Sequence, residues 1–374
     1  MKRIPFLKPN LVRKKAYQKY LAQIDASRLY SNYGPLNSLF ERRVLEEYFR
    51  SEGDLTTVNN ATIGLMLAIS QTKRRGGRYA LMPSFTFPAT PLAAMWCGLE
   101  PYFIDIRADD WCMDESVLTE TLDRLGSQAA CVVAYATFGT CMDLSLYESL
   151  HRTGMPVIID AASSFGASSD GGMFGCGFSG PVVYSLHATK TFGIGEGGMV
   201  YSSDRDLIRN LRQAGNFGFS ADRVSVTLGL NGKLSEYAAA IALATLDVFQ
   251  EKMQTRLQIS RWYVDAMTQK GLFDANWVEQ KTLGTVPRQV NSFLCPPNRT
   301  NNVLIDLLRE KGIEARSYFF PACHQQKTFE MFQHSGLETT EGISARVINL
   351  PTWEEMSKDD VWAVIDALAG GTAK

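Results

Sequence analysis

Residues 156–160 read PVIID, and residues 181–190 read PVVYSLHATK. Both begin at a proline, continue as short apolar runs and end in polar residues, which is typical of buried strands in a parallel sheet. Similar runs stand at residues 79–82, 101–105, 130–134 and 199–201, with helical stretches between most of them, including residues 37–49 and 62–70. This alternation predicts an α/β fold with a doubly wound, mixed but mostly parallel sheet, whose binding crevice lies at the carboxyl ends of its strands.

The chain changes in character after the predicted sheet. A long helical stretch covers residues 233–270 and ends at Gly271, and the rest contains proline-rich joints. We therefore expect a large α/β domain over residues 1–250 and a smaller α+β domain over residues 251–374.

Composition and charge exclude several classes of protein. The 374 residues include 38 basic and 39 acidic side chains, a net charge of −1, so neither disorder nor a nucleic-acid partner is expected. The seven scattered cysteines form no C-x-x-C pair, which favours a reducing, cytoplasmic location. No apolar run approaches the roughly 18 residues of a membrane span, and the four histidines lack metal-ligand spacing, so neither membrane insertion nor a metal is expected.

Two further patterns in the sequence point to less specific features. Gly193, Gly195 and Gly198 match G-x-G-x-x-G, but they lead into a strand, whereas a dinucleotide fingerprint opens a helix. The first 19 residues carry seven basic side chains and no acid, which fits either a solvated helix face or a local field for an anionic substrate.

The candidate chemistry centres on Lys190 and Asp160. Lys190 follows one buried strand, where an apolar pocket can keep its amine deprotonated and nucleophilic. Asp160 ends the other strand, where an acid is usually a ligand contact or a helix cap. Pyridoxal phosphate (PLP) needs a lysine for its aldimine and a carboxylate that keeps its ring nitrogen protonated. The two residues supply that pair of groups.

Other residues could hold the rest of this cofactor. Asn59–Gly64 precede a predicted helix, whose first turn offers free N–H groups and a favourable dipole for a phosphate. Ser185 could add a hydroxyl, and Phe87 could cover the ring, although Thr62 alone would be explained as an N-cap and Phe87 as a core residue.

In order along the chain, these motifs resemble the DegT/DnrJ/StrS family of PLP-dependent sugar aminotransferases. The matching stretches are NNATI at residues 59–63, PSFTFPAT at 83–90, Asp160-Ala-Ala, Ser185 with Lys190, GEGG at 195–198, LGLNGKLSE at 228–236, RSYFFP at 316–321 with His324, and NLP at 349–351. The resemblance implies an aspartate-aminotransferase-like, fold-type-I homodimer with active sites at the subunit interface.

The resemblance also implies roles for single residues. Lys190 would form the internal aldimine, Asp160 would bind the pyridine nitrogen, and Phe87 would stack on the ring. The phosphate would be held by Thr62, Ile63 and Ser185, together with Asn231 of the partner subunit. The weaker substrate candidates are Tyr33, His187, Arg316, Tyr318 and His324, and further cations near the mouth of the site are Arg28 and Lys233.

The sequence departs from the family pattern at Ser163. This family often carries Gln or His there, on the cofactor or substrate side of the ring. Serine is too short for the same direct hydrogen bond, so a water, Ser164 or His187 could substitute. Tyr33 stands where the family often has threonine, which would shape the sugar pocket differently. For His187 a structural and a substrate role are both open.

The resemblance predicts transfer of an amino group from L-glutamate to a nucleotide-linked keto-deoxysugar, at C3 or C4, in amino-sugar biosynthesis for O-antigen or another polysaccharide. Three alternatives stay open: a sugar dehydratase, another fold-type-I PLP enzyme and a non-catalytic relative. Lys190 speaks against the dehydratases, which typically replace this lysine with histidine. Arg316 could serve as the carboxylate-binding arginine of an amino-acid aminotransferase or lyase.

Overall fold

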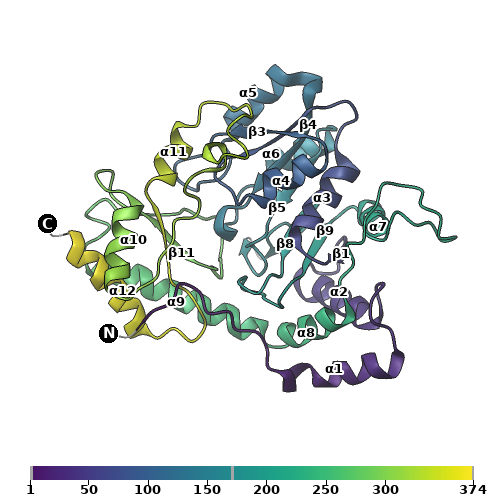
Figure 1. The fold of residues 1–374 in the computed structure, drawn as a ribbon, viewed down its shortest axis with the longest axis horizontal. Coiled ribbons are helices and arrows are strands. Elements are labelled where there is room, and N and C mark those ends of the chain that lie inside the picture. The colour runs from purple at the N-terminus through teal and green to yellow at the C-terminus, as the bar shows by residue number, and fades with distance from the viewer. Residues whose placement is uncertain (1–2, 170–171, 373–374) are drawn as a thin grey trace.

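A seven-stranded sheet forms the centre of the larger part of the molecule in a computed structural model, which describes residues 3–169 and 172–372 (Figure 1). The strand order is β1-β9-β8-β5-β4-β2-β3, and only β9 runs antiparallel to its neighbours. The bounds are β1 Asp54–Val58, β2 Tyr79–Pro83, β3 Glu100–Ile104, β4 Ala129–Tyr135, β5 Val157–Asp160, β8 Val182–Ser185 and β9 Gly198–Ser202. The mixed, mostly parallel sheet predicted from the sequence is confirmed.

Helices cover both faces of this sheet because alternate strand residues point to opposite sides. Val132 and Ile159 belong to the core on one face, and Val133 and Ile158 to the core on the other. The first face is covered by α1 Lys14–Ser27, α2 Pro35–Tyr48, α5 Glu115–Leu125, α6 Ser145–Arg152 and α8 Glu236–Leu246, and the second by α3 Ala61–Thr72, α4 Ala89–Trp96 and α7 Arg205–Ala214.

A second, smaller sheet has its own core. Strands β10 Val278–Glu279, β11 Asn291–Leu294 and β12 Val347–Leu350 pair antiparallel, and α9 Phe249–Gln269, α10 Asn301–Glu310 and α12 Lys358–Thr372 pack on them. Ile4 belongs to this core and pairs with Ile313, so the N-terminal segment lies beside α12 (Figure 1). The remaining elements are β6 Ser168–Ser169, β7 Gly172–Met173, α11 Glu338–Ser344, and three 3-10 turns at Gly126–Gln128, Thr137–Gly139 and Cys323–Gln325. Within the described part of the chain, every helix is too short or too polar to cross a membrane.

The helical stretch expected over residues 233–270 is two helices, α8 and α9. The break lies at Asp247 and Val248, where Val248 leaves the helical region with φ −118° and ψ 5°. The two helices pack against different partners, α8 against α1 and α2 and α9 mainly against α12. Because of the break, α8 packs in the core of the large sheet and most of α9 packs in the core of the small sheet.

Candidate active site

The ends of two adjacent strands bring the predicted cofactor residues together. Asp160 is the last residue of β5, and Ser185 is the last residue of the neighbouring strand β8. A turn after β8, closed by a 2.9 Å hydrogen bond from the Lys190 N–H to the His187 carbonyl, places Lys190 over this edge. The site therefore lies where a parallel sheet is expected to bind ligands, outside the carboxyl ends of its strands.

Asp160 is a buried carboxyl group with fixed partners. Its side chain is 3% exposed, and Oδ2 accepts a 2.7 Å hydrogen bond from Thr90 Oγ1 in α4. The Ala162 N–H donates to Oδ1 at 3.2 Å. Burial raises the pKa of Asp160, while the hydrogen bond from Thr90 acts in the opposite direction. These contacts hold the carboxyl group in one orientation at the strand end.

Lys190 meets two neutral partners. Its Nζ donates to Ser163 Oγ at 2.8 Å and to Gln289 Oε1 at 3.2 Å, and Ser163 Oγ itself donates to the same Gln289 oxygen at 3.0 Å. Burial lowers the pKa of Lys190 to about 8, and the charge of Asp160 opposes this shift only in part. A large fraction of this amine is therefore neutral, and so nucleophilic, just above neutral pH.

The start of α3 lies against the end of β8. Ser185 pairs with Gly198 of β9, and a Cβ added to Gly198 would lie 2.8 Å from the backbone nitrogen of Ala61. The Asn60 side chain caps this helix by accepting from the Ile63 N–H at 2.9 Å, so that N–H already has a partner. The N–H groups of Ala61 and Thr62 stand in the same first turn, where a helix leaves its donors free. The structure thus brings Thr62 and Ser185 to one edge of the sheet, beside a helix N-terminus.

Phe87 and Asn231 are both exposed. The Phe87 ring is 57% exposed and lies 6.4 Å from the ring of Phe319, a residue of the smaller unit. Asn231 pairs through its backbone with Asn216, at the base of the loop that follows α7 and projects from the molecule (Figure 1). Stacking by Phe87 and a phosphate contact by Asn231 stay predictions.

The weaker substrate candidates have internal partners. Tyr33 donates to the Arg212 carbonyl at 3.2 Å, the Arg212 guanidinium lies 3.8 Å from the ring centroid, and burial raises the pKa of Tyr33 to about 12. His187 Nδ1 shares a 2.9 Å hydrogen bond with Thr189. Tyr33 and His187 thus have partners within their own chain, and their contacts with a substrate stay predictions.

Segment 316–324 joins the two parts of the molecule. Arg316 donates to Tyr318 Oη at 2.9 Å, and its guanidinium lies 5.1 Å from the ring of Phe6. His324 shares hydrogen bonds with Ser84, at the end of β2, at 2.7 Å and with Glu341 at 3.1 Å. The contact of His324 with Ser84 connects the end of this segment to the large sheet. These contacts leave Arg316, Tyr318 and His324 as predictions for substrate binding.

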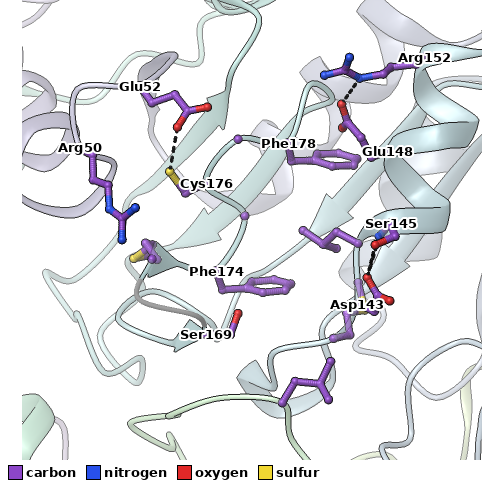
Figure 2. A pocket seen from close by; sticks show the side chains of 17 residues that line it. Arg50, Glu52, Asp143, Ser145, Glu148, Arg152, Ser169, Phe174, Cys176 and Phe178 are labelled. Carbon is purple, nitrogen blue, oxygen red and sulfur yellow. Dashed lines mark hydrogen bonds and ion pairs between the residues drawn. The ribbon is translucent and has the colours of Figure 1, made fainter.

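A sizeable cavity lies elsewhere. It has a volume of about 720 Å³, and its lining includes Gly175–Phe178, which precede β8, whereas Lys190 follows β8. In Figure 2, Cys176 faces Glu52, and Ser145 donates to Asp143 at 2.6 Å. The cavity therefore lies toward the amino end of β8 and is separate from the Lys190 site.

Comparison with known proteins agrees with this geometry. Residues 12–369 match the model of the DegT/DnrJ/EryC1/StrS aminotransferase family. The chain belongs to this family. A candidate PLP-dependent aminotransferase from Bacillus cereus has a crystal structure that matches with a TM-score of 0.97 and 47% identity, covering 98% of this chain and 100% of that one. The structure of DesI with its TDP-sugar product matches with a TM-score of 0.89 and 28% identity, covering 100% of this chain and 94% of that one. The dTDP-4-amino-4,6-dideoxy-D-glucose transaminase of Escherichia coli is 26% identical over 382 residues, 99% of each chain.

The family predicted from the sequence is therefore confirmed, together with its fold, its aminotransferase activity and its PLP cofactor. The donor set at the strand ends fits PLP. It offers an amine with a lowered pKa, a buried carboxyl group, and a hydroxyl beside a helix N-terminus. Gly198 leaves no room for a side chain beside the backbone of Asn60 and Ala61, so it lets the start of α3 lie close to the strand ends.

Two residues of this aminotransferase site were missed in the sequence. Thr90 is the last residue of the quoted PSFTFPAT stretch, so the motif could have drawn attention to it, although its partner Asp160 lies 70 residues away. Gln289 lies 126 residues from its partner Ser163, and no local pattern marks it. The Ser163 hydroxyl contacts Lys190 and Gln289, and a substitute role for a water, Ser164 or His187 stays a prediction.

Proposed function

We propose that this aminotransferase moves an amino group from L-glutamate to a nucleotide-linked keto-deoxysugar, at C3 or C4 of the sugar. The observation that carries the chemistry is the Lys190 amine, with its pKa lowered to about 8 by burial, beside the fixed carboxyl group of Asp160. The substrate class is supported by the named activity of the Escherichia coli relative and by DesI, whose structure contains a TDP-sugar product. The product would enter amino-sugar biosynthesis for O-antigen or another polysaccharide. A cytoplasmic location accords with the free thiols of all seven cysteines.

Each site residue then has a task. PLP, when bound, supplies an electron sink for the carbon that exchanges its amino group. Lys190 holds the cofactor and, once freed by the amino donor, moves the proton at the donor's α-carbon. Asp160 keeps the proton on the ring nitrogen, and Thr90 orients Asp160 through its 2.7 Å hydrogen bond. Thr62, Ser185 and the first turn of α3 would hold the phosphate. The Ile63 N–H could join them only by giving up its hydrogen bond to Asn60.

We also propose a homodimer in which Asn231 reaches the partner's phosphate site. The loop before Asn231 exposes several apolar side chains, which a monomer would leave in water: Phe217 at 44%, Val224 at 56%, Val226 at 61% and Leu228 at 76%. Burial of such a group by a second copy would be favourable. Asn231 is exposed on the same loop, which suits a contact outside its own chain.

The test of the substrate class is a half-reaction screen. The holoenzyme is treated with L-glutamate until the visible absorbance of the bound cofactor is lost. Candidate nucleotide-linked 3-keto and 4-keto sugars are then added, one at a time. We expect one of them to restore the absorbance, and the matching sugar without its nucleotide to fail.

Two outcomes would contradict the proposal. Restoration by a simple 2-keto acid, with no response to any nucleotide sugar, would indicate an amino-acid aminotransferase. If L-glutamate did not bleach the absorbance and another amino donor did, the proposed donor would be wrong. The proposed class of acceptor would not be affected.

A further inference from the structure

We propose that Gln289 is a positioning residue for Lys190, and that residues 280–289 are anchored on the large sheet in order to deliver it. The proposal rests on Lys190 being the lysine that binds PLP. Gln289 lies just before β11 of the smaller sheet, yet its side chain reaches the strand ends of the larger one. It therefore brings the second part of the molecule into direct contact with the reactive amine.

Gln289 offers Lys190 a neutral acceptor. The single oxygen Oε1 accepts from Lys190 Nζ at 3.2 Å and from Ser163 Oγ at 3.0 Å, and Ser163 accepts from Lys190 at 2.8 Å. The three side chains form a closed triangle that confines the nitrogen on two sides. Gln289 Nε2 donates to Thr189 Oγ1 at 3.4 Å, and this contact fixes which way the amide group is turned.

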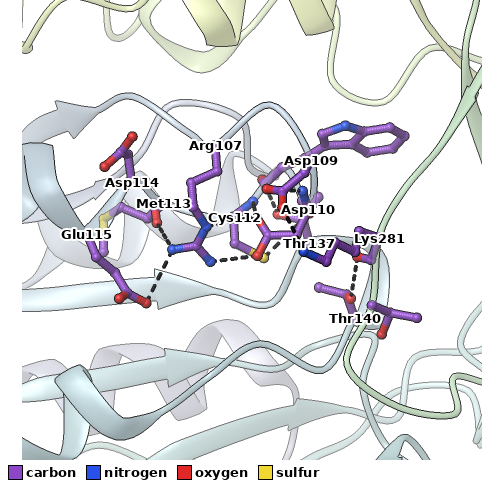
Figure 3. A network of polar contacts seen from close by, with 12 residues as sticks. Arg107, Asp109, Asp110, Cys112, Met113, Asp114, Glu115, Thr137, Thr140 and Lys281 are labelled. Atoms are coloured by element: carbon purple, nitrogen blue, oxygen red, sulfur yellow. Dashed lines mark hydrogen bonds and ion pairs between the residues drawn. The ribbon is translucent and has the colours of Figure 1, made fainter.

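The beginning of this segment is fastened to the large sheet. Gln280 is 2% exposed, and its Nε2 donates to the carbonyl oxygens of Asp110 at 2.7 Å and Thr137 at 3.0 Å. Both acceptors lie in loops that follow strands β3 and β4. In Figure 3, Lys281 lies beside Asp109, with which it forms a 3.2 Å ion pair, and Arg107 holds Asp110 at 2.6 Å. The segment thus starts from a rigid point at the carboxyl edge of the sheet.

The end of the segment is held from both sides. Thr191 Oγ1 donates to the Pro287 carbonyl at 2.9 Å. Arg256 of α9, in turn, donates from one nitrogen to the carbonyl oxygens of residues 288 and 289, at 3.1 and 3.2 Å. The Arg256 guanidinium is also paired with Glu354 at 2.9 Å, and the two side chains are only 5% and 8% exposed. Because a buried charge tolerates few alternative positions, this pair fixes the backbone from which Gln289 projects.

The charges around Lys190 show why a neutral acceptor matters. Asp160 faces it from β5, and Lys8, Lys252, Arg256 and Glu354 line a small pocket beside it. Glu354 is already paired with Arg256, and Asp160 is held by Thr90. A carboxylate in the position of the Gln289 amide would stabilise the ammonium form and keep the amine protonated. The amide holds the nitrogen in place without that cost to its reactivity.

The test compares Gln289→Glu with Gln289→Met in the full-length enzyme. The holoenzyme is titrated with pH while its visible absorbance is recorded. In parallel, protein freed of cofactor is labelled with trinitrobenzenesulfonate at a series of pH values, and labelling at Lys190 is measured by peptide mass mapping. Gln128→Glu, at an exposed position just before β4, adds the same charge elsewhere as a control.

We expect the two variants to shift the labelling midpoint in opposite directions. In the unmodified protein labelling rises as the pH passes about 8, where the amine loses its proton. Gln289→Glu moves the midpoint up by about one unit or more, because a nearby opposite charge favours the ammonium. Gln289→Met moves it down by up to about one unit, because the ammonium loses an acceptor. The spectral midpoint moves with the same signs, and Gln128→Glu moves neither.

If Gln289 had a purely structural role, the labelling midpoint of Lys190 would move in the same direction in both variants or in neither. Either result would overturn the proposal. Circular dichroism and the melting temperature show whether each variant is folded, and Gln289→Leu replaces Gln289→Met if the latter is not. The proposed function fails separately. In that case the unmodified protein acquires no visible absorbance with PLP, or Lys190→Ala acquires the same absorbance.

Discussion

Two regions meet at Lys190, and they are built in different ways. Asp160 and Ser185 end adjacent strands of the large sheet, within one stretch of sequence. Gln289 comes from a separate segment that reaches the site only through contacts with Asp110, Thr137 and Arg256. The strand ends are brought together by the sheet topology and local hydrogen bonds, whereas the segment depends on buried polar contacts with distant parts of the chain. We therefore expect changes at the strand ends to affect chemistry, and changes in the segment to affect stability and the state of the amine.

Removal of the amine at the strand ends should have the largest effect. Lys190→Ala should lower the rate of transamination by about 10⁴-fold or more, because it removes both the covalent attachment and the proton carrier. The measurement is single-turnover loss of visible absorbance after addition of L-glutamate. Lys311→Ala, which removes a lysine bonded to the Ala367 carbonyl at 3.3 Å, serves as the control and should keep its rate. Turnover by the Lys190 variant would refute the assignment.

Loss of Arg256 should mainly affect the segment. Arg256→Leu leaves Glu354 buried without its closest partner and frees the carbonyl groups of residues 288 and 289. We expect the free energy of unfolding to fall by about 3 kcal/mol or more, measured by urea denaturation. The labelling midpoint of Lys190 should rise, because a cation beside the amine is lost and Glu354 keeps an uncompensated negative charge.

The matched control for Arg256 is an exposed ion pair. Arg309 pairs with Asp306 at 2.6 Å, but the two side chains are 71% and 64% exposed. Arg309→Leu should change the free energy of unfolding by less than about 1 kcal/mol, since water already screens this pair. If the free energy of unfolding fell equally in the two variants, the buried pair would stabilise the protein no more than the exposed pair does.

The same contrast explains what the sequence could predict. The strands that end at Asp160 and Ser185 stand out as apolar runs bounded by proline and polar residues, so the sheet and the position of the candidate lysine could be predicted from local pattern. Gln289 could not, because its role depends on a contact over 126 residues of sequence. Tyr33 shows a different limit. Its motif position predicts a contact with the substrate, but the stacking of Arg212 on its ring could not be predicted from that motif, and the substrate contact stays a prediction.

A third region would come from the second subunit. Asn231→Ala should weaken PLP retention by up to about 100-fold, because a hydrogen bond to the charged phosphate is lost. Cofactor release during dialysis measures this loss. When the Asn231→Ala protein is mixed with the Lys190→Ala protein under exchange of subunits, about a quarter of the sites should become intact in a two-fold dimer. If activity stays absent after exchange, each site is built from one chain.

The smallest expected effect comes from a variant that changes how Asp160 is held but leaves Asp160 itself in place. Thr90→Val keeps the shape of the side chain but removes the 2.7 Å hydrogen bond to Asp160. This hydrogen bond lowers the pKa of Asp160, whereas burial raises it, so the variant should have a still higher pKa. A carboxyl group with a raised pKa gains its proton earlier as the pH falls, so PLP retention should decline at a higher pH than in the unmodified enzyme. At neutral pH we expect a loss of about tenfold in PLP affinity, from one hydrogen bond to a charged group. Thr245→Val, which removes a 2.9 Å hydrogen bond to the Ile241 carbonyl inside α8, controls for the loss of a buried hydroxyl. An unchanged pH profile in Thr90→Val would mean that burial alone sets the state of Asp160, and that the strand end needs no support from α4.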